Sequence, residues 1–131
     1  MIKAFKRGLD PDFLFIEPYE LVVTKEIRTA VSMALRDVTY ELGPFITLMD
    51  GPTFEFSWHE RKRLILNHVA GADLVAISRT DLLETEQVEK IRNALKDHVG
   101  NNHVLGLSIS LNRGMKEVIE KILGKDTWQP V

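Results

Sequence analysis

The chain has 131 residues, a common length for one domain, and the sequence predicts a single domain over residues 1–124 followed by a short tail at 125–131. Its net charge of -2 argues against partners such as nucleic acid or an anionic membrane, which are recognised through bulk positive charge. The chain has no cysteine, no secretory-signal pattern and no run of about 20 apolar residues, which excludes disulfides, cysteine nucleophiles and thiolate metal sites and predicts a cytoplasmic protein.

Four short apolar runs predict β-strands, and none of them alternates strictly between apolar and polar residues. They are FLFIE (13–17), FITLMD (45–50), LVAIS (74–78) and VLGLSIS (104–110). Continuous apolar runs of this length are typical of parallel sheets that are covered on both faces. About 30 residues separate one start from the next, which is the size of a strand plus a crossover helix. The sequence therefore predicts a three-layer α/β domain with a mainly parallel sheet of about four strands.

Each run is followed by a segment whose apolar residues recur at helical spacing. The predicted first residues or caps of these helices are Thr24, Ser57, Thr85 and Asn112. Ser57 and Glu60 have the spacing of a capping box, and Gly100 and Gly124 are predicted to end the last two helices.

Polar residues stand where each predicted strand ends. They are Glu17, Asp50, the segment 78–81 and Ser108. In open α/β sheets, ligands bind beyond the carboxyl ends of the strands, and these ends share one edge of the sheet. A binding site is therefore predicted there.

The third ending, SRTD at 78–81, resembles the Asn-Lys-x-Asp loop by which guanine-specific GTPases recognise their base. The resemblance implies that Asp81 accepts the ring N–H and the exocyclic amine of guanine, and that Arg79 stacks on the base in place of lysine. Ser78 occupies the asparagine position with a shorter side chain. The alternative for Asp81 is a cap of the turn or of the helix near Thr85.

The fourth ending, LSISLNRG at 107–114, resembles the Ser-Ala turn that follows about thirty residues later in the same GTPases. The resemblance places Ser108 and Ile109 in that turn, whose backbone N–H groups reach the guanine oxygen. The alternative for Ser108 is a structural role in an ordinary turn.

Together with PDFLFIEPYELVV (11–23) and ITLMDG (46–51), these motifs make residues 10–123 similar to the C-terminal portion of the CobW/HypB/UreG P-loop GTPases. The resemblance implies a truncated P-loop NTPase fold of the SIMIBI type, GTP or GDP with Mg²⁺ as ligands, and a role in delivering a metal or a metal cofactor such as nickel or cobalamin. Glu17 corresponds to the family's acid on the metal side, with a salt bridge to a lysine as the alternative.

Three departures from the family bear on activity. The 131 residues contain no G-x-x-x-x-G-K-[ST] phosphate loop, Tyr19 and Glu20 replace a Ser/Thr-Gly pair, and the cysteine-containing metal motif is missing. Contacts to the phosphates supply most of the binding free energy of a nucleotide. Base contacts alone therefore predict a dissociation constant no better than millimolar, a binding free energy of about 4 kcal/mol, and binding of no nucleotide by this chain alone is the other expectation. Hydrolysis of GTP by these residues alone is not expected.

In P-loop folds the strand before the phosphate loop lies between the strands that correspond to 13–17 and 45–50. Without it, the flanking strands close into a smaller sheet, an identical chain fills the gap, or a partner polypeptide carrying the phosphate loop completes the sheet. The competing function is a non-catalytic interaction module that binds a client, or itself, through an exposed sheet edge. A flavodoxin- or receiver-like domain would need a phosphate loop or an acidic pair after its first strand, which FIEPYE (15–20) does not clearly provide.

The histidines and the basic run HERKR (59–63) predict neither a zinc site nor a nucleic-acid surface. Arg63 occupies the position of the second histidine in H-E-x-x-H, and the other histidines share no ligand spacing.

Overall fold

The computed structural model describes residues 8–19, 21–37, 39–99 and 103–124. The chain divides into two compact units, Met1–Leu42 and Gly43–Val131. The single domain expected for 1–124 stays a prediction, and the expected tail at 125–131 lies outside the described residues. No helix within the described ranges has the length and apolar character needed to cross a membrane.

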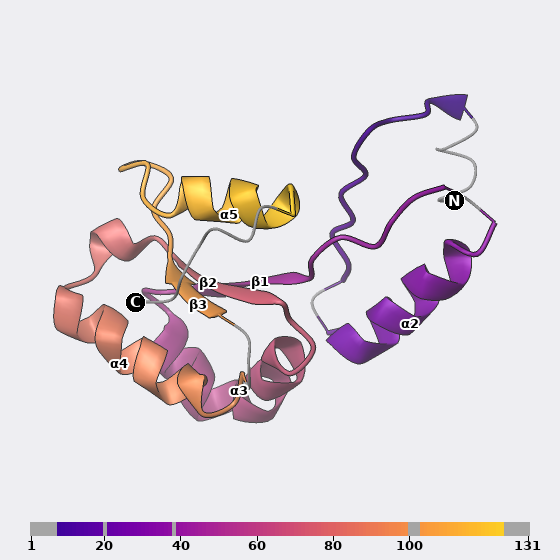
Figure 1. Cartoon of the computed structure of the whole chain (residues 1–131). Coiled ribbons are helices and arrows are strands. Elements are labelled where there is room, and N and C mark those ends of the chain that lie inside the picture. The colour runs from indigo at the N-terminus through magenta and orange to yellow at the C-terminus, as the bar shows by residue number, and fades with distance from the viewer. Residues whose placement is uncertain (1–7, 20, 38, 100–102, 125–131) are drawn as a thin grey trace. The chain divides into compact units, whose positions relative to one another are not determined.

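The second unit is built on a parallel sheet of three strands (Figure 1). These are β1 (Ile46–Asp50), β2 (Leu74–Ser78) and β3 (His103–Gly106), in the order β1-β2-β3. The register pairs Ile46 with Leu74, and Leu74 with His103. The predicted α/β class and parallel strands are therefore confirmed, and the sheet has three strands in the part of the chain that the structure describes, where about four were expected.

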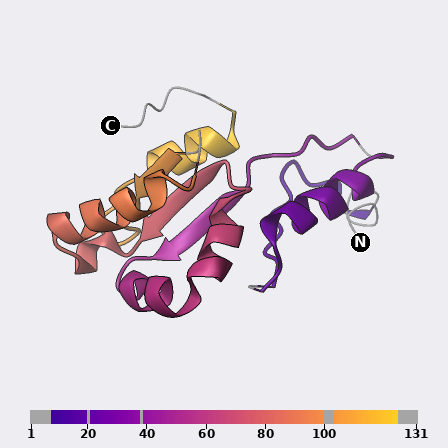
Figure 2. The ribbon, with the colours of Figure 1, turned by 90° about the horizontal axis from the view of Figure 1, so that it is seen from below.

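Helices cover both faces of this sheet, as Figures 1 and 2 show. On one face lie α3 (Phe54–Val69) and α4 (Thr85–Lys96), and on the other lies α5 (Met115–Ile122). The core between the sheet and the first two helices includes Met49, Val75, Ile77, Val104, Phe54, Ile65, Val69, Ile91 and Leu95. The central strand β2 is buried from Leu74 to Ile77, which explains its uninterrupted apolar sequence.

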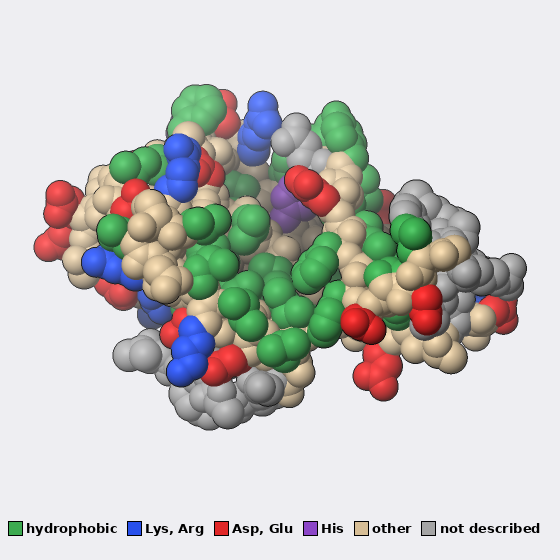
Figure 3. Space-filling model, turned by 90° about the horizontal axis from the view of Figure 1, so that it is seen from above, with side chains coloured by type: hydrophobic (Ala, Val, Ile, Leu, Met, Phe, Trp, Pro, Cys, Tyr) green, Lys and Arg blue, Asp and Glu red, His purple; other side chains and the backbone are tan. Residues whose placement is uncertain are grey.

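The α5 side of the sheet is less completely covered near β1. Leu48 points to the opposite face from Met49, because side chains alternate along a strand, and it is 63% exposed. Ile119 within α5 and Leu123 directly after it are also exposed. Figure 3, viewed from the α5 side, shows hydrophobic side chains gathered on this face. Among the described residues no strand pairs with the outer edge of β1.

Two glycines shape the turns at the carboxyl edge of the sheet. The Gly51 N–H donates to the Ser78 carbonyl at 3.0 Å, and a Cβ at residue 51 would lie only 2.7 Å from that oxygen. Gly114 has a φ of +77°, and a Cβ there would collide with the Gly106 carbonyl oxygen. Only glycine fits at these positions without a shift of the backbone.

The first unit contains α2 (Thr24–Ala34) and irregular chain in its described part. The strand predicted at 13–17 is wrong, since this run is irregular and Phe15 is 73% exposed. A strand needs a neighbour to pair its N–H and C=O groups, and the described part of this unit offers none. Its irregular chain is instead tied by Tyr40, whose hydroxyl donates to the Pro11 carbonyl at 2.8 Å.

The helices form where expected, but their caps differ from the prediction. Thr24 and Thr85 are the first residues of α2 and α4, whereas α3 begins before Ser57 and α5 begins after Asn112. The N-caps are Val23, Thr53, Glu84 and Gly114 instead of the four predicted residues. The capping box predicted at Ser57 and Glu60 is wrong, because the Ser57 N–H already donates to the Thr53 carbonyl within α3. The capping box lies at Glu84 and Gln87 instead.

The predicted ends of the last two helices have different outcomes. Gly124 follows α5 with a φ of +73°, so its predicted role at the end of that helix is confirmed. Gly100 lies outside the described residues.

Candidate functional site

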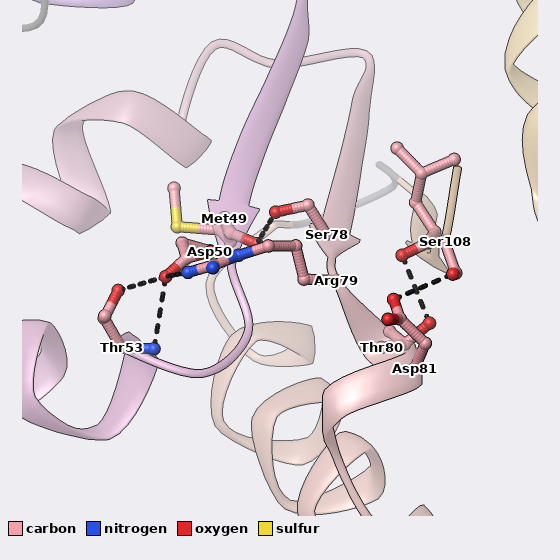
Figure 4. A network of polar contacts seen from close by, with 9 residues as sticks. Met49, Asp50, Thr53, Ser78, Arg79, Thr80, Asp81 and Ser108 are labelled. Atoms are coloured by element: carbon pink, nitrogen blue, oxygen red, sulfur yellow. Dashed lines mark hydrogen bonds and ion pairs between the residues drawn. The ribbon is translucent and has the colours of Figure 1, made fainter. Parts of the chain in front are cut away.

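The carboxyl ends of β1, β2 and β3 bring two small polar clusters to one edge of the sheet (Figure 4). The first cluster joins Asp50, Thr53 and Arg79, and the second joins Asp81 and Ser108. Four of the five residues predicted to contact the base make side-chain hydrogen bonds at this edge: Ser78, Arg79, Asp81 and Ser108. The edge is thus the polar end of the sheet that the sequence predicted.

Arg79 forms a two-pronged ion pair with Asp50. Its Nε donates to Oδ1 at 2.6 Å and its Nη2 donates to Oδ2 at 2.8 Å. The Thr53 hydroxyl also donates to Asp50 Oδ2, at 2.5 Å, and the Thr53 N–H donates to it at 3.3 Å. These hydrogen bonds, first from Arg79 and then from Thr53, lower the pKa of Asp50 from 3.8 to about 2. Both partners are therefore charged at neutral pH.

The backbone of Arg79 has a left-handed conformation, with φ 55° and ψ 40°. This conformation costs a non-glycine residue on the order of 1–2 kcal/mol. It turns the chain sharply from β2 into a short 3-10 helix, η1 (Thr80–Leu82). Thr80 anchors that helix, because its N–H and its hydroxyl donate to the Leu107 carbonyl at 3.2 and 3.1 Å. The loop is therefore held from the β1 side and from the β3 side.

Asp81 is the exposed carboxylate of the second cluster. The buried Ser108 hydroxyl donates to its Oδ1 at 2.8 Å, and this hydrogen bond is the main cause that lowers the pKa of Asp81. Ser108 is itself held, since its hydroxyl oxygen accepts the Leu111 N–H at 3.3 Å. An ionised carboxylate in a set orientation is suited to accept adjacent N–H donors from a ligand.

Ser78 and Ile109 border these clusters. The Ser78 hydroxyl donates to the Met49 carbonyl at 3.3 Å, so the residue ties the loop to β1. Ile109 is 77% exposed in the turn after Ser108, where its carbonyl accepts the Asn112 N–H at 3.1 Å. β3 is shorter than the predicted strand because the chain doubles back here, with Ser108 paired to Arg113.

Glu17 belongs to the first unit, whereas both clusters belong to the second. It lies exposed in the irregular chain of the first unit. No group of three or more His, Asp or Glu side chains suited to a metal ion occurs in the described ranges. The assignment of Glu17 to the Mg²⁺ side stays a prediction.

Sequence reasoning marked Asp50 as a polar strand end but missed its ion pair with Arg79, and it missed the roles of Thr53 and Thr80. The signal for this ion pair lies in the strand register of the assembled sheet. Asp50 and Ser78 are register partners at the ends of adjacent parallel strands, so the residue after Ser78 reaches Asp50 if it is long and basic.

Comparisons with known proteins identify the family. The family model of the CobW/HypB/UreG nucleotide-binding domain matches residues 1–105, which includes the loop from Ser78 to Asp81 and ends before Ser108. The comparisons with curated proteins and with solved structures gave no match. Domains of this family bind nucleotide, and the parallel α/β sheet is compatible with a truncated P-loop NTPase fold. The chain therefore belongs to the CobW/HypB/UreG family of GTPase-related nucleotide-binding proteins.

Proposed function

We propose that this chain is the base-recognising part of a CobW/HypB/UreG-type GTPase and that Asp81 selects guanine. The observation that carries the proposal is the exposed, ionised Asp81 carboxylate, held at 2.8 Å by the Ser108 hydroxyl at the carboxyl edge of a parallel sheet. Family membership supports nucleotide as the ligand class.

Guanine presents two adjacent donors, the ring N–H and the exocyclic amine, to a carboxylate. Adenine has a lone pair at the corresponding ring nitrogen and a C–H in place of the amine, so it offers no donor to either carboxylate oxygen and brings an acceptor against one of them. In this proposal the hydrocarbon stem of Arg79 covers one face of the base. Ser78 sets the start of the loop, and the backbone at Ser108 and Ile109 faces the guanine oxygen.

The phosphates contribute little to binding by these residues, because the sequence contains no G-x-x-x-x-G-K-[ST] loop to cradle them. Guanosine, GMP and GDP are therefore expected to bind with similar affinity, at about the millimolar level. Hydrolysis requires a phosphate loop and Mg²⁺ from elsewhere, with Glu17 on the metal side.

We further propose that a partner polypeptide supplies the phosphate loop, or that a second copy of this chain completes the sheet. The complete assembly would work in the cytoplasm and deliver a metal or a metal cofactor such as nickel or cobalamin, as the family relationship suggests.

A second candidate function is a non-catalytic interaction module. Two observations favour it: no strand in the described ranges pairs with the outer edge of β1, and Leu48 is 63% exposed. An unpaired apolar edge strand is a surface to which another chain can add a strand. This module would bind protein without needing nucleotide.

Calorimetric titration with GDP and with ADP separates the two candidates. The chain is titrated alone and together with any polypeptide carrying a phosphate loop that is encoded directly upstream. Guanine-selective binding that disappears in Asp81→Ala and survives in Asp97→Ala, a control at an exposed aspartate after α4, supports the base reader. Absence of binding in both settings refutes it and leaves the module. A solution mass twice that of one chain favours completion by a second copy.

A further inference from the structure

The geometry points to Asp50 as a positioning residue for base recognition: its carboxylate fixes the Arg79 side chain as a preformed wall against which the base stacks. This inference rests on the proposed function of Asp81. It adds a residue whose task is performed through Arg79, without contact between Asp50 and the nucleotide.

The first step is the path of the Arg79 side chain. It runs from the end of β2 to the end of β1, where two of its nitrogens are bound to Asp50 at 2.6 and 2.8 Å. Figure 4 shows Arg79 directed toward Asp50, while Asp81 on the far side of the same loop is directed toward Ser108. The Arg79 side chain and the Asp81 carboxylate are thus held by separate partners, so both are in place before a ligand binds.

The second step is that Asp50 is itself fixed. Thr53 at the start of α3 binds its Oδ2 through both the hydroxyl and the N–H. Gly51 next to it approaches the loop so closely that a Cβ would lie 2.7 Å from the Ser78 carbonyl oxygen. Because the turn is held by these contacts, the positions of β1 and α3 determine where the Asp50 carboxylate lies, and so where the Arg79 side chain is held.

The third step is accessibility. The Arg79 side chain is 54% exposed and that of Asp50 is 35% exposed, so a ligand can lie against Arg79 while the ion pair persists. A long arginine side chain in solvent samples many rotamers. Hydrogen bonds from two guanidinium nitrogens to one carboxylate remove that freedom before the nucleotide binds. Lysine at this position would make a single-point contact and lose that geometry.

The test compares GMP and AMP affinities by NMR titration of the full chain in four variants: Asp50→Asn, Arg79→Lys, the double variant and Glu55→Gln. Glu55→Gln is the matched control, because it removes an exposed ion pair with Lys90 (3.3 Å) that lies outside both clusters. The dispersed amide spectrum of each variant checks that it folds. Arg79→Lys keeps the hydrocarbon stem and tests the same contact if Asp50→Asn does not fold.

We expect Asp50→Asn and Arg79→Lys each to weaken GMP binding by about threefold to tenfold, and the double variant to be no weaker than the single ones. The preference for GMP over AMP should persist in all of them, because Asp81 is untouched. Glu55→Gln should bind like the wild type.

Two results would overturn the inference without affecting the proposal that Asp81 recognises guanine. One is wild-type GMP affinity in Asp50→Asn; the other is a double variant in which the two losses multiply, which would mean that Asp50 acts independently of Arg79. A wild-type chain that binds no GMP would overturn the inference and the proposed function together.

Discussion

Asp50→Asn should destabilise the fold in a way that depends on pH. Asparagine has nearly the same shape as aspartate but carries no charge, so it weakens the two-pronged contact with Arg79 and the bonds from Thr53. The pKa of Asp50 is lowered to about 2 in the folded chain, and its ordinary value is 3.8. A carboxylate whose pKa is lower when folded contributes stability above its unfolded pKa and loses it as the pH falls through its folded pKa.

The size of the effect follows from the same values. The difference between 3.8 and about 2 corresponds at full weight to about 2.4 kcal/mol, and solvent screening of a side chain that is 35% exposed reduces this to about 1 kcal/mol. Asp50→Asn should therefore lower the free energy of unfolding by about 1 kcal/mol at neutral pH. The difference from the wild type should shrink between pH 4 and pH 2, where Asp50 becomes protonated.

Urea denaturation of both proteins at pH 7, pH 4 and the lowest pH at which the wild type folds measures this difference directly. Glu55→Gln serves again as the control, because its ion pair with Lys90 joins two largely exposed side chains and should contribute little. A loss in Asp50→Asn that equals the control at pH 7, or that stays constant down to the acid limit, would refute the reasoning.

Three further predictions concern the same edge of the sheet. Arg79→Gln should raise the pKa of the Asp50 carboxyl from about 2 toward 3.8, which a carbon-detected NMR titration measures, and an unmoved pKa would contradict the assigned cause. Ser108→Ala should raise the pKa of Asp81 by removing its main hydrogen bond and should weaken GMP binding, which the same titration and a ligand titration follow. Gly114→Ala should cost about 1–3 kcal/mol, because its φ is +77° and a Cβ would meet backbone, and a thermal melt unchanged from the wild type would show that the turn relaxes.

The sequence predicted the parts of the fold that local pattern determines. The run at 74–78 formed a central strand that is buried from Leu74 to Ile77 between helices on both faces, and the run at 46–50 pairs with it in parallel. The run at 13–17 is as short and apolar but formed no strand, because a strand depends on a paired neighbour that the apolar pattern does not reveal. The observed helix caps differ from the predicted ones because contacts in the preceding turn determine where a helix begins. In α3, the turn from Asp50 to Thr53 is held by the hydrogen bond from the Thr53 N–H to Asp50.

The candidate site was predicted in part. Motif and spacing located Arg79, Asp81 and Ser108 at one edge, and the Ser108 to Asp81 hydrogen bond joins two of them. The ion pair between Asp50 and Arg79 was missed because the motif assigned Arg79 to stacking on the nucleotide base and gave Asp50 no role. Contacts between residues 29 positions apart follow from strand register, which appears only once the sheet is assembled.

The central claim is that the Asp81 carboxylate accepts hydrogen bonds from the two N–H donors of guanine. Its most direct test is a titration of the wild type and of Asp81→Asn with GMP, IMP and AMP, followed by NMR at the amides of residues 78–81. IMP keeps the ring N–H but lacks the exocyclic amine, so the wild type should bind GMP most tightly, IMP less tightly and AMP least, and Asp81→Asn should abolish this order. Equal affinities in the wild type, or the same order in Asp81→Asn, would contradict the claim.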